Sequence, residues 1–278
     1  MSTQPSRPPF DSNRAWGDAV NLVNSNRDLL LALAGVFLVV PAFAVAMLLP
    51  QPPPPEGAEM QAVLATLGEY YQSNSIALVS IALFQMIGSL SMLALFTDSA
   101  RPTVGEAIRL GFQYTPTAIA AQLLLAFAIG SMVLLPVLLG GATKSPGITA
   151  LTIVVAVALG VWAMIRLSLL APAVMVDRLA NPLKAMGRSW QLTEGNVLRL
   201  LAFFVLVLIG FIVVTLVAEG VVRLTLTLVA GDKPADIVAT LVATLMQAAM
   251  SVYFIAISAA CHRQLAGPTT QSIVDKFD

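Results

Sequence analysis

Six long apolar stretches alternate with short polar segments along the chain. They cover residues 29–49, 76–96, 117–139, 148–165, 200–217 and 237–259. A helix needs about 20 apolar residues to cross roughly 30 Å of hydrocarbon, and each stretch is of that order. The stretches are continuous and do not alternate with period two, so they predict helices and not the strands of a membrane barrel. We therefore expect an all-α integral membrane protein with six transmembrane helices.

The composition agrees with this class. Hydrophobic residues make up 58% of the 278 residues and charged residues 11%, against about 25% charged in a soluble domain. The 15 basic and 15 acidic residues cancel, so we expect no nucleic-acid partner. Cys261 is the single cysteine and His262 the single histidine. This excludes an intramolecular disulfide framework and a multi-histidine metal site, and we expect neither a metal nor a cofactor.

The basic residues predict the orientation in the membrane. If both termini are inside, the inner segments hold 11 of the 15 basic residues and the outer loops hold three. The outer three are Lys144, Arg223 and Lys233, and Arg166 lies within a span. Short loops rich in Lys and Arg stay in the cytoplasm, so both termini are predicted to be cytoplasmic.

A short amphipathic stretch precedes each outward-going span, and the three stretches are similar to one another. Residues 17–22 (GDAVNL) align with residues 105–110 (GEAIRL), and the segment that starts at Thr103 aligns with the one that starts at Asn181. Thr103 and Asn181 are both residue types that cap helix N-termini. Such helices are expected to lie in the membrane interface. The alternative is that interfacial helices in general resemble one another.

These stretches suggest how the chain is organised. We expect three parallel repeats, each an interfacial helix followed by a transmembrane hairpin, because every unit starts and ends on the inner side. Their approximate bounds are 10–98, 99–177 and 178–263. A cytoplasmic segment (1–27) with the first interfacial helix precedes the six-helix transmembrane domain (28–263), and a polar cytoplasmic tail (264–278) follows it.

The most specific segment follows the fourth apolar stretch. It reads RLSLLAP at 166–172, VMVD at 174–177, NPLKA at 181–185 and RSWQLTEGN at 188–196. This segment resembles the YciC-type bacterial inner-membrane proteins and the related membrane domain attached to some glycerophosphoryl diester phosphodiesterases. The resemblance implies a multi-pass protein of the bacterial inner membrane. It does not carry the phosphodiesterase activity, since the catalytic domain of those enzymes is a separate soluble module for which this chain has no room.

Two kinds of candidate contact lie in this segment. Arg166 is expected near the inner edge of the hydrocarbon, where it either reaches lipid phosphates or pairs with Asp177 or an anionic substrate. Trp190 is expected to anchor its helix in the interface. A basic cluster surrounds them and is either a topology signal or an attractor of anionic lipid. It consists of Arg178, Lys184, Arg188 and Arg199.

The sequence contains no motif that points to catalysis. Walker loops, dinucleotide fingerprints and HExxH are absent, so we expect no enzyme. The first hypothesis is an inner-membrane protein that organises lipid or assists other membrane proteins, with membrane lipids, other membrane proteins or its own copies as partners. The second is a small-molecule or lipid transporter with a site near Arg166. A cavity lined by Arg166, Gln85 or Gln122 would favour the second.

The predicted orientation can be tested by chemical labelling. Single cysteines introduced in a Cys261→Ser background are probed in intact cells with a membrane-impermeant thiol reagent. Labelling is expected at positions 56–72 and 142–146, which the positive-inside rule places outside. Labelling near residue 103 or 181 would contradict the prediction.

Overall fold

The computed structural model describes residues 9–52, 60–97, 103–143 and 145–267, and within these ranges every regular element is a helix. Six helical segments are long and apolar enough to cross a membrane, which confirms the predicted class and number of candidate spans. They are Arg27–Leu48, Ser75–Phe96, Val104–Ala142, Pro146–Met175, Val197–Ala230 and Asp232–Ala266.

The first span is one continuous helix with a π-helical turn in its middle. It runs from α2 (Arg27–Ala34) through the π-helix η1 (Gly35–Val39) into α3 (Val40–Leu48). Pro41 is the second residue after the π-helical turn and lacks the N–H that an α-helix would direct to the carbonyl four residues back. A π-helical turn accommodates such a ring without breaking the helix.

Part of the segment between the first two spans is helical. Part of the predicted outer loop forms α4 (Met60–Ser73), which leads through Asn74 into the second span, α5 (Ser75–Thr97). The Tyr70 hydroxyl donates a hydrogen bond to the Leu49 carbonyl at 2.8 Å. This bond ties the end of α4 to the end of α3 and satisfies one of the last carbonyls of that helix.

The three amphipathic stretches do not share one form, and the repeat organisation is not confirmed. The first is a separate helix, α1 (Ser12–Ser25), and the third is α9 (Pro182–Leu192). The second is continuous with its span in α6 (Val104–Ala142), which begins at the predicted Thr103–Glu106 capping box. Nothing in α6 separates an interfacial part from the membrane-spanning part, because the helix continues through Pro116.

The fourth span ends in a break that positions the specific segment. Helix α7 (Pro146–Arg166) stops at Arg166, and after a turn the short helix α8 (Leu170–Met175) begins. The bend therefore precedes Pro172. Pro172 is the third residue of α8, where a missing backbone N–H leaves no hydrogen bond unmade.

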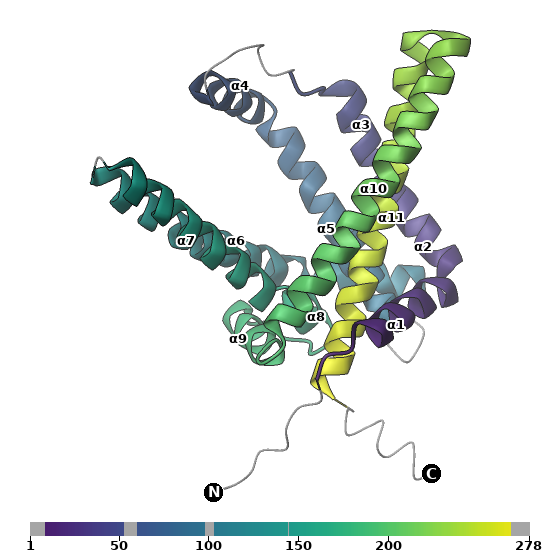
Figure 1. The fold of residues 1–278 in the computed structure, drawn as a ribbon. Helices are drawn as coiled ribbons and strands as arrows, with labels where there is room; N and C mark the ends of the chain where they lie inside the picture. The colour runs from purple at the N-terminus through teal and green to yellow at the C-terminus, as the bar shows by residue number, and fades with distance from the viewer. Residues whose placement is uncertain (1–8, 53–59, 98–102, 144, 268–278) are drawn as a thin grey trace, which may run out of the picture.

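The helices pack closely at one end and spread at the other (Figure 1). We call the end that holds α1, α8 and α9 the packed end and the opposite end the open end. Both ends of the described chain lie at the packed end. The hairpin of α6 and α7 diverges from the hairpin of α10 (Val197–Ala230) and α11 (Asp232–Ala266) towards the open end.

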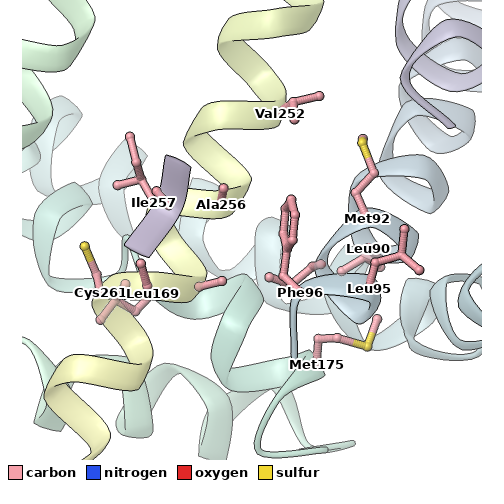
Figure 2. Packing of buried hydrophobic residues seen from close by; sticks show 14 of the residues in the cluster. Leu90, Met92, Leu95, Phe96, Leu169, Met175, Val252, Ala256, Ile257 and Cys261 are labelled. Atoms are coloured by element: carbon pink, nitrogen blue, oxygen red, sulfur yellow. The ribbon is translucent and has the colours of Figure 1, made fainter. Parts of the chain in front are cut away.

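The buried core lies at the packed end. It joins the second half of α5, the residues around α8 and the second half of α11 (Figure 2). Leu169, Ala173 and Val174 are fully buried, as are Ala256 and Ile257 of α11. The short helix α8 thus forms the centre of the packed end.

Close contact between α5 and α6 depends on Gly111. A Cβ atom at this position would lie 2.7 Å from the Ile87 carbonyl oxygen and would also meet the Ser91 hydroxyl. We expect Gly111→Ala to lower the free energy of unfolding by about 1–3 kcal/mol, because overpacking forces the two backbones apart. Thermal unfolding of the detergent-solubilised chain measures the change.

The control variant is Gly130→Ala in the same helix. A Cβ atom at Gly130 has no neighbour within 4 Å, so the variant should be neutral or gain up to about 1 kcal/mol from helix propensity. Equal behaviour of the two variants would show that the α5–α6 contact does not require a glycine.

Candidate functional site

The candidate site is built at the packed end around α9. Asn181 caps this helix as predicted: its side chain accepts hydrogen bonds from the backbone N–H groups of Leu183 and Lys184 at 3.0 and 3.2 Å. Pro182 occupies the first helical position, where its fixed φ is already helical. The capped helix buries Ala185 and Ser189 and exposes Lys184 on the other side.

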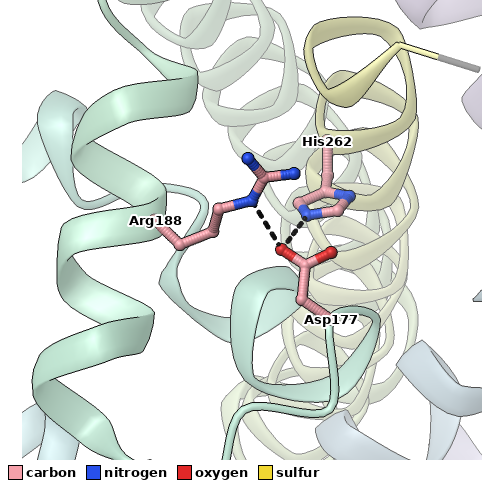
Figure 3. Close-up of polar contacts among 3 residues, drawn as sticks. All are labelled: Asp177, Arg188 and His262. Carbon is pink, nitrogen blue, oxygen red and sulfur yellow. Dashed lines mark hydrogen bonds and ion pairs between the residues drawn. The ribbon is translucent and has the colours of Figure 1, made fainter. Parts of the chain in front are cut away.

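Asp177, in the turn after α8, contacts both α9 and α11 (Figure 3). One oxygen, Oδ2, accepts a hydrogen bond from Nε of Arg188 in α9 at 2.9 Å. The same oxygen lies 3.2 Å from Nε2 of His262 in α11. A carboxylate only accepts, so this contact requires the proton on Nε2 of the imidazole. The side chain of His262 is 2% exposed, that of Asp177 23% and that of Arg188 35%.

The surroundings of Asp177 favour its ionised form. Burial by itself would raise the pKa of this carboxyl group. The hydrogen bonds from His262 and Arg188 and the positive charge of Arg188 act in the opposite direction and outweigh it, so the pKa lies below its ordinary value of 3.8. Asp177 is therefore a carboxylate at neutral pH and holds α9 and α11 together.

Arg166 lies beside two indole rings that contact each other. Its guanidinium carbon is 5.4 Å from the ring centroid of Trp162 and 4.8 Å from that of Trp190, within the range of cation–π attraction. The two rings meet edge to face at 4.8 Å. Nη1 donates to the Trp190 carbonyl at 3.0 Å, and Nε has no partner among the residues described. Within the same residues Arg166 and Asp177 do not pair, and each has partners of its own.

The backbone carbonyl of Arg166 has two hydroxyl partners from α9 and the residue after it. Ser189 Oγ donates to it at 2.9 Å and Thr193 Oγ1 at 3.2 Å. Both side chains are fully buried. The end of α7 is thus capped by α9, and Trp190 lies against Arg166 as a result.

The sequence-predicted residues divide into two groups. Arg166, Asp177, Arg188 and Trp190 belong to the packed contacts described above, and together with His262 we call them the inner cluster. Arg178, Lys184 and Arg199 are exposed. Arg178 has a positive φ of 50° in the turn between α8 and α9, a backbone conformation that few residues other than glycine adopt. Whether any of these residues contacts lipid stays a prediction.

The contact of His262 with Asp177 and the contacts of two polar side chains with distant residues were not predicted from the sequence. From the sequence, the single histidine, His262, served only to exclude a multi-histidine metal site. A histidine within an apolar helix nevertheless requires a hydrogen-bond partner when it is buried. Thr193 reaches Arg166, and Asn196 Oδ1 accepts from the Phe10 N–H at 2.9 Å, which joins the start of the described chain to the α9–α10 turn.

The inner cluster provides positive charge and rigid positioning. Among the described residues, no group of three or more His, Cys, Asp or Glu side chains could hold a metal ion. The partly exposed guanidinium of Arg188 has donors besides the one that Asp177 accepts. Such an arrangement can hold an anionic headgroup at the membrane surface.

The ion pairs of Asp177 predict a pH-dependent stability. Asp177→Asn should cost about 1–3 kcal/mol near neutral pH, since hydrogen bonds to charged groups are lost. Because the pKa is lower in the folded chain than its ordinary 3.8, the wild-type advantage is full above about pH 5 and disappears as the pH falls through the folded value. Thermal unfolding between pH 7 and pH 3 measures both effects.

A matched control lies near the tip of the α10–α11 hairpin. Asp236 pairs with Arg223 at 2.8 Å, with both side chains more than half exposed, so Asp236→Asn should change stability by less than about 1 kcal/mol. Equal losses of stability in Asp177→Asn and Asp236→Asn would show that the contacts of Asp177 contribute no more than an exposed ion pair.

Comparison with known proteins identifies the family. No protein with a curated description and no solved structure matches the chain. Residues 133–272 match the family described as the membrane domain of glycerophosphoryl diester phosphodiesterase. The match runs from the end of α6 through α11 and includes every residue of the inner cluster. The chain therefore belongs to the family of membrane domains of glycerophosphoryl diester phosphodiesterases.

Proposed function

We propose that this chain is a non-enzymatic protein of the bacterial inner membrane that organises lipid or assists other membrane proteins. The observation that carries the proposal is the divergence of the α6–α7 and α10–α11 hairpins towards the open end (Figure 1). Large apolar side chains along both hairpins are exposed. They include Leu134, Leu135, Leu138 and Leu139 of α6, Leu151 and Val154 of α7, and Leu224 and Leu228 of α10. In a bilayer such surfaces are covered by acyl chains or by the apolar faces of other proteins.

The exposed basic residues at the packed end support a preference for anionic lipid. Lys184 of α9 and Arg199 at the start of α10 are exposed, and α9 itself is held in place by the ion pair between Asp177 and Arg188. Each basic residue close to an anionic surface contributes about 1 kcal/mol before screening by salt. We infer that α9 lies in the cytoplasmic interface and gathers anionic headgroups.

A groove at the open end favours a transporter as the second candidate. It has a volume of about 590 Å³ and lies between α3, α5 and α11. The amide side chains of Gln85 and Gln247 line it, together with Tyr70 near the end of α4. Amide side chains that line a groove within the membrane can form hydrogen bonds with a polar solute. Arg166 is not among the residues that line this groove, so the path would differ from the one expected at Arg166.

The proposed lipid preference can be tested on the reconstituted full chain. The relative affinity for spin-labelled anionic and zwitterionic phospholipid is measured by electron paramagnetic resonance. The double variant Lys184→Gln/Arg199→Gln should reduce the anionic preference by up to about 2 kcal/mol at low salt, or roughly 30-fold. The control Arg223→Gln/Lys233→Gln changes two exposed basic residues near the tip of the α10–α11 hairpin and should leave the preference unchanged.

Other outcomes decide between the candidate functions. If the affinity does not depend on the charge of the lipid, Lys184 and Arg199 serve only to set the orientation of the chain in the membrane. Transport of a solute or lipid that is abolished by Gln85→Leu would favour the second candidate. Turnover of a glycerophosphodiester by the purified chain would contradict the non-enzymatic assignment.

A further inference from the structure

An apolar groove follows one face of α10 at the packed end. Its volume is about 490 Å³, and it lies between α10 and the start of α1. The α10 side chains that line it recur at helical spacing and so form one stripe. They are Phe203, Leu206, Val207, Gly210, Phe211 and Val214.

The other wall of the groove is aromatic. The ring of Trp16 in α1 stacks on Tyr253 of α11 with centroids 5.8 Å apart and planes 15° apart. Tyr253 also contacts Phe211 at 5.8 Å. These contacts hold Trp16 at the side of the groove although its side chain is 41% exposed. The wall is therefore fixed and does not need a ligand to form.

The two ends of the groove differ in polarity. Ser12 and Asn13 line the end next to α1, and their side chains have no hydrogen-bond partner within the described part of the chain. From Phe203 to Val214 the stripe is apolar and about 16 Å long at 1.5 Å per residue. That length is close to the depth of one leaflet, since the hydrocarbon core is roughly 30 Å thick.

The volume decides between a lipid chain and a protein helix as occupant. A helix about 10 Å across occupies on the order of 1,300 Å³ over this length, so only its side chains could enter the groove. A methylene chain about 4–5 Å across needs on the order of 300 Å³, which fits. The groove opens along α10 within the predicted span, beside the exposed side chains of Leu206 and Val214, so it is reached from the bilayer.

We propose that this groove binds one acyl chain of a glycerophospholipid, with the polar headgroup beside Ser12 and Asn13 and the chain along α10 as far as Val214. The inference rests on the proposed role in lipid organisation and gives that role a defined site. Gly210 keeps the groove open: a Cβ atom there has no neighbour within 4 Å. A larger side chain at this position would occupy the space of the lipid chain.

The test uses the full chain in phosphatidylcholine and phosphatidylglycerol vesicles that contain a phospholipid with a photoreactive diazirine in its acyl chain. After irradiation, mass spectrometry locates the labelled residues. In the wild type, labelling should concentrate on Trp16 and the α10 stripe. It should be weaker on Val205 and Ile212, which are also exposed but face away from the stripe.

Gly210→Leu is the deciding variant and Gly220→Leu its control. Both glycines lie in α10 with no atom within 4 Å of an added Cβ, so both variants should fold, and matching thermal unfolding curves verify this. Labelling of the stripe should fall about tenfold in Gly210→Leu, or about 1.4 kcal/mol of binding. In Gly220→Leu it should stay at the wild-type level.

Three results would overturn the inference. One is equal labelling of the stripe and of the opposite face, which would mean ordinary contact with surrounding lipid. Another is unchanged labelling in Gly210→Leu. The last is a change in oligomeric state in Gly210→Leu without a change in labelling, which would assign the groove to a second copy of the chain. If any of these results occurs while the preference for anionic lipid still depends on Lys184 and Arg199, only lipid binding in the groove is refuted and the proposed function stands.

Discussion

The carbonyl group of Arg166 ends a membrane-spanning helix, where the backbone has no helical partner of its own. A buried carbonyl group that has no hydrogen-bond partner costs about 1–3 kcal/mol. The hydroxyls of Ser189 and Thr193 satisfy it. This requirement fixes α9 beneath α7 and brings Trp190 against Arg166. The position of the whole segment after the fourth span depends on it.

Asp177 extends the same arrangement to the last helix. Its carboxylate binds Arg188 on α9 and His262 on α11, so the segment attached to α7 is also attached to the end of α11. Asn196 connects the α9–α10 turn to Phe10 in the same region. Polar contacts between distant segments thus gather at the packed end, where they surround the buried residues of α8.

The two ends of the molecule consequently differ in physical character. The packed end has a buried core and fixed polar contacts. The open end presents large apolar side chains that are exposed among the described residues. This difference between the two ends is the basis of the proposed role in lipid organisation.

Much of the fold was predictable because hydropathy acts locally. A run of about 20 apolar residues specifies a membrane helix regardless of its neighbours, and capping side chains such as Thr103 and Asn181 specify where helices start. Two features were not predictable this way. Helix α4 is ordered beside α3 by the bond between Tyr70 and Leu49, and α6 continues through the expected boundary at Pro116.

The membrane class, the six candidate spans, the helix caps and the family segment were predictable from the chain alone, since each of these depends on residues that are close together in it. Which polar side chains meet is visible only in the folded protein. Asp177 and His262 are 85 positions apart. For Arg166, the spacing of residues along the chain did not distinguish between Asp177, lipid and the two indole rings as partners. Long side chains reach over several ångströms, so the partner of an ionised group depends on how the helices pack.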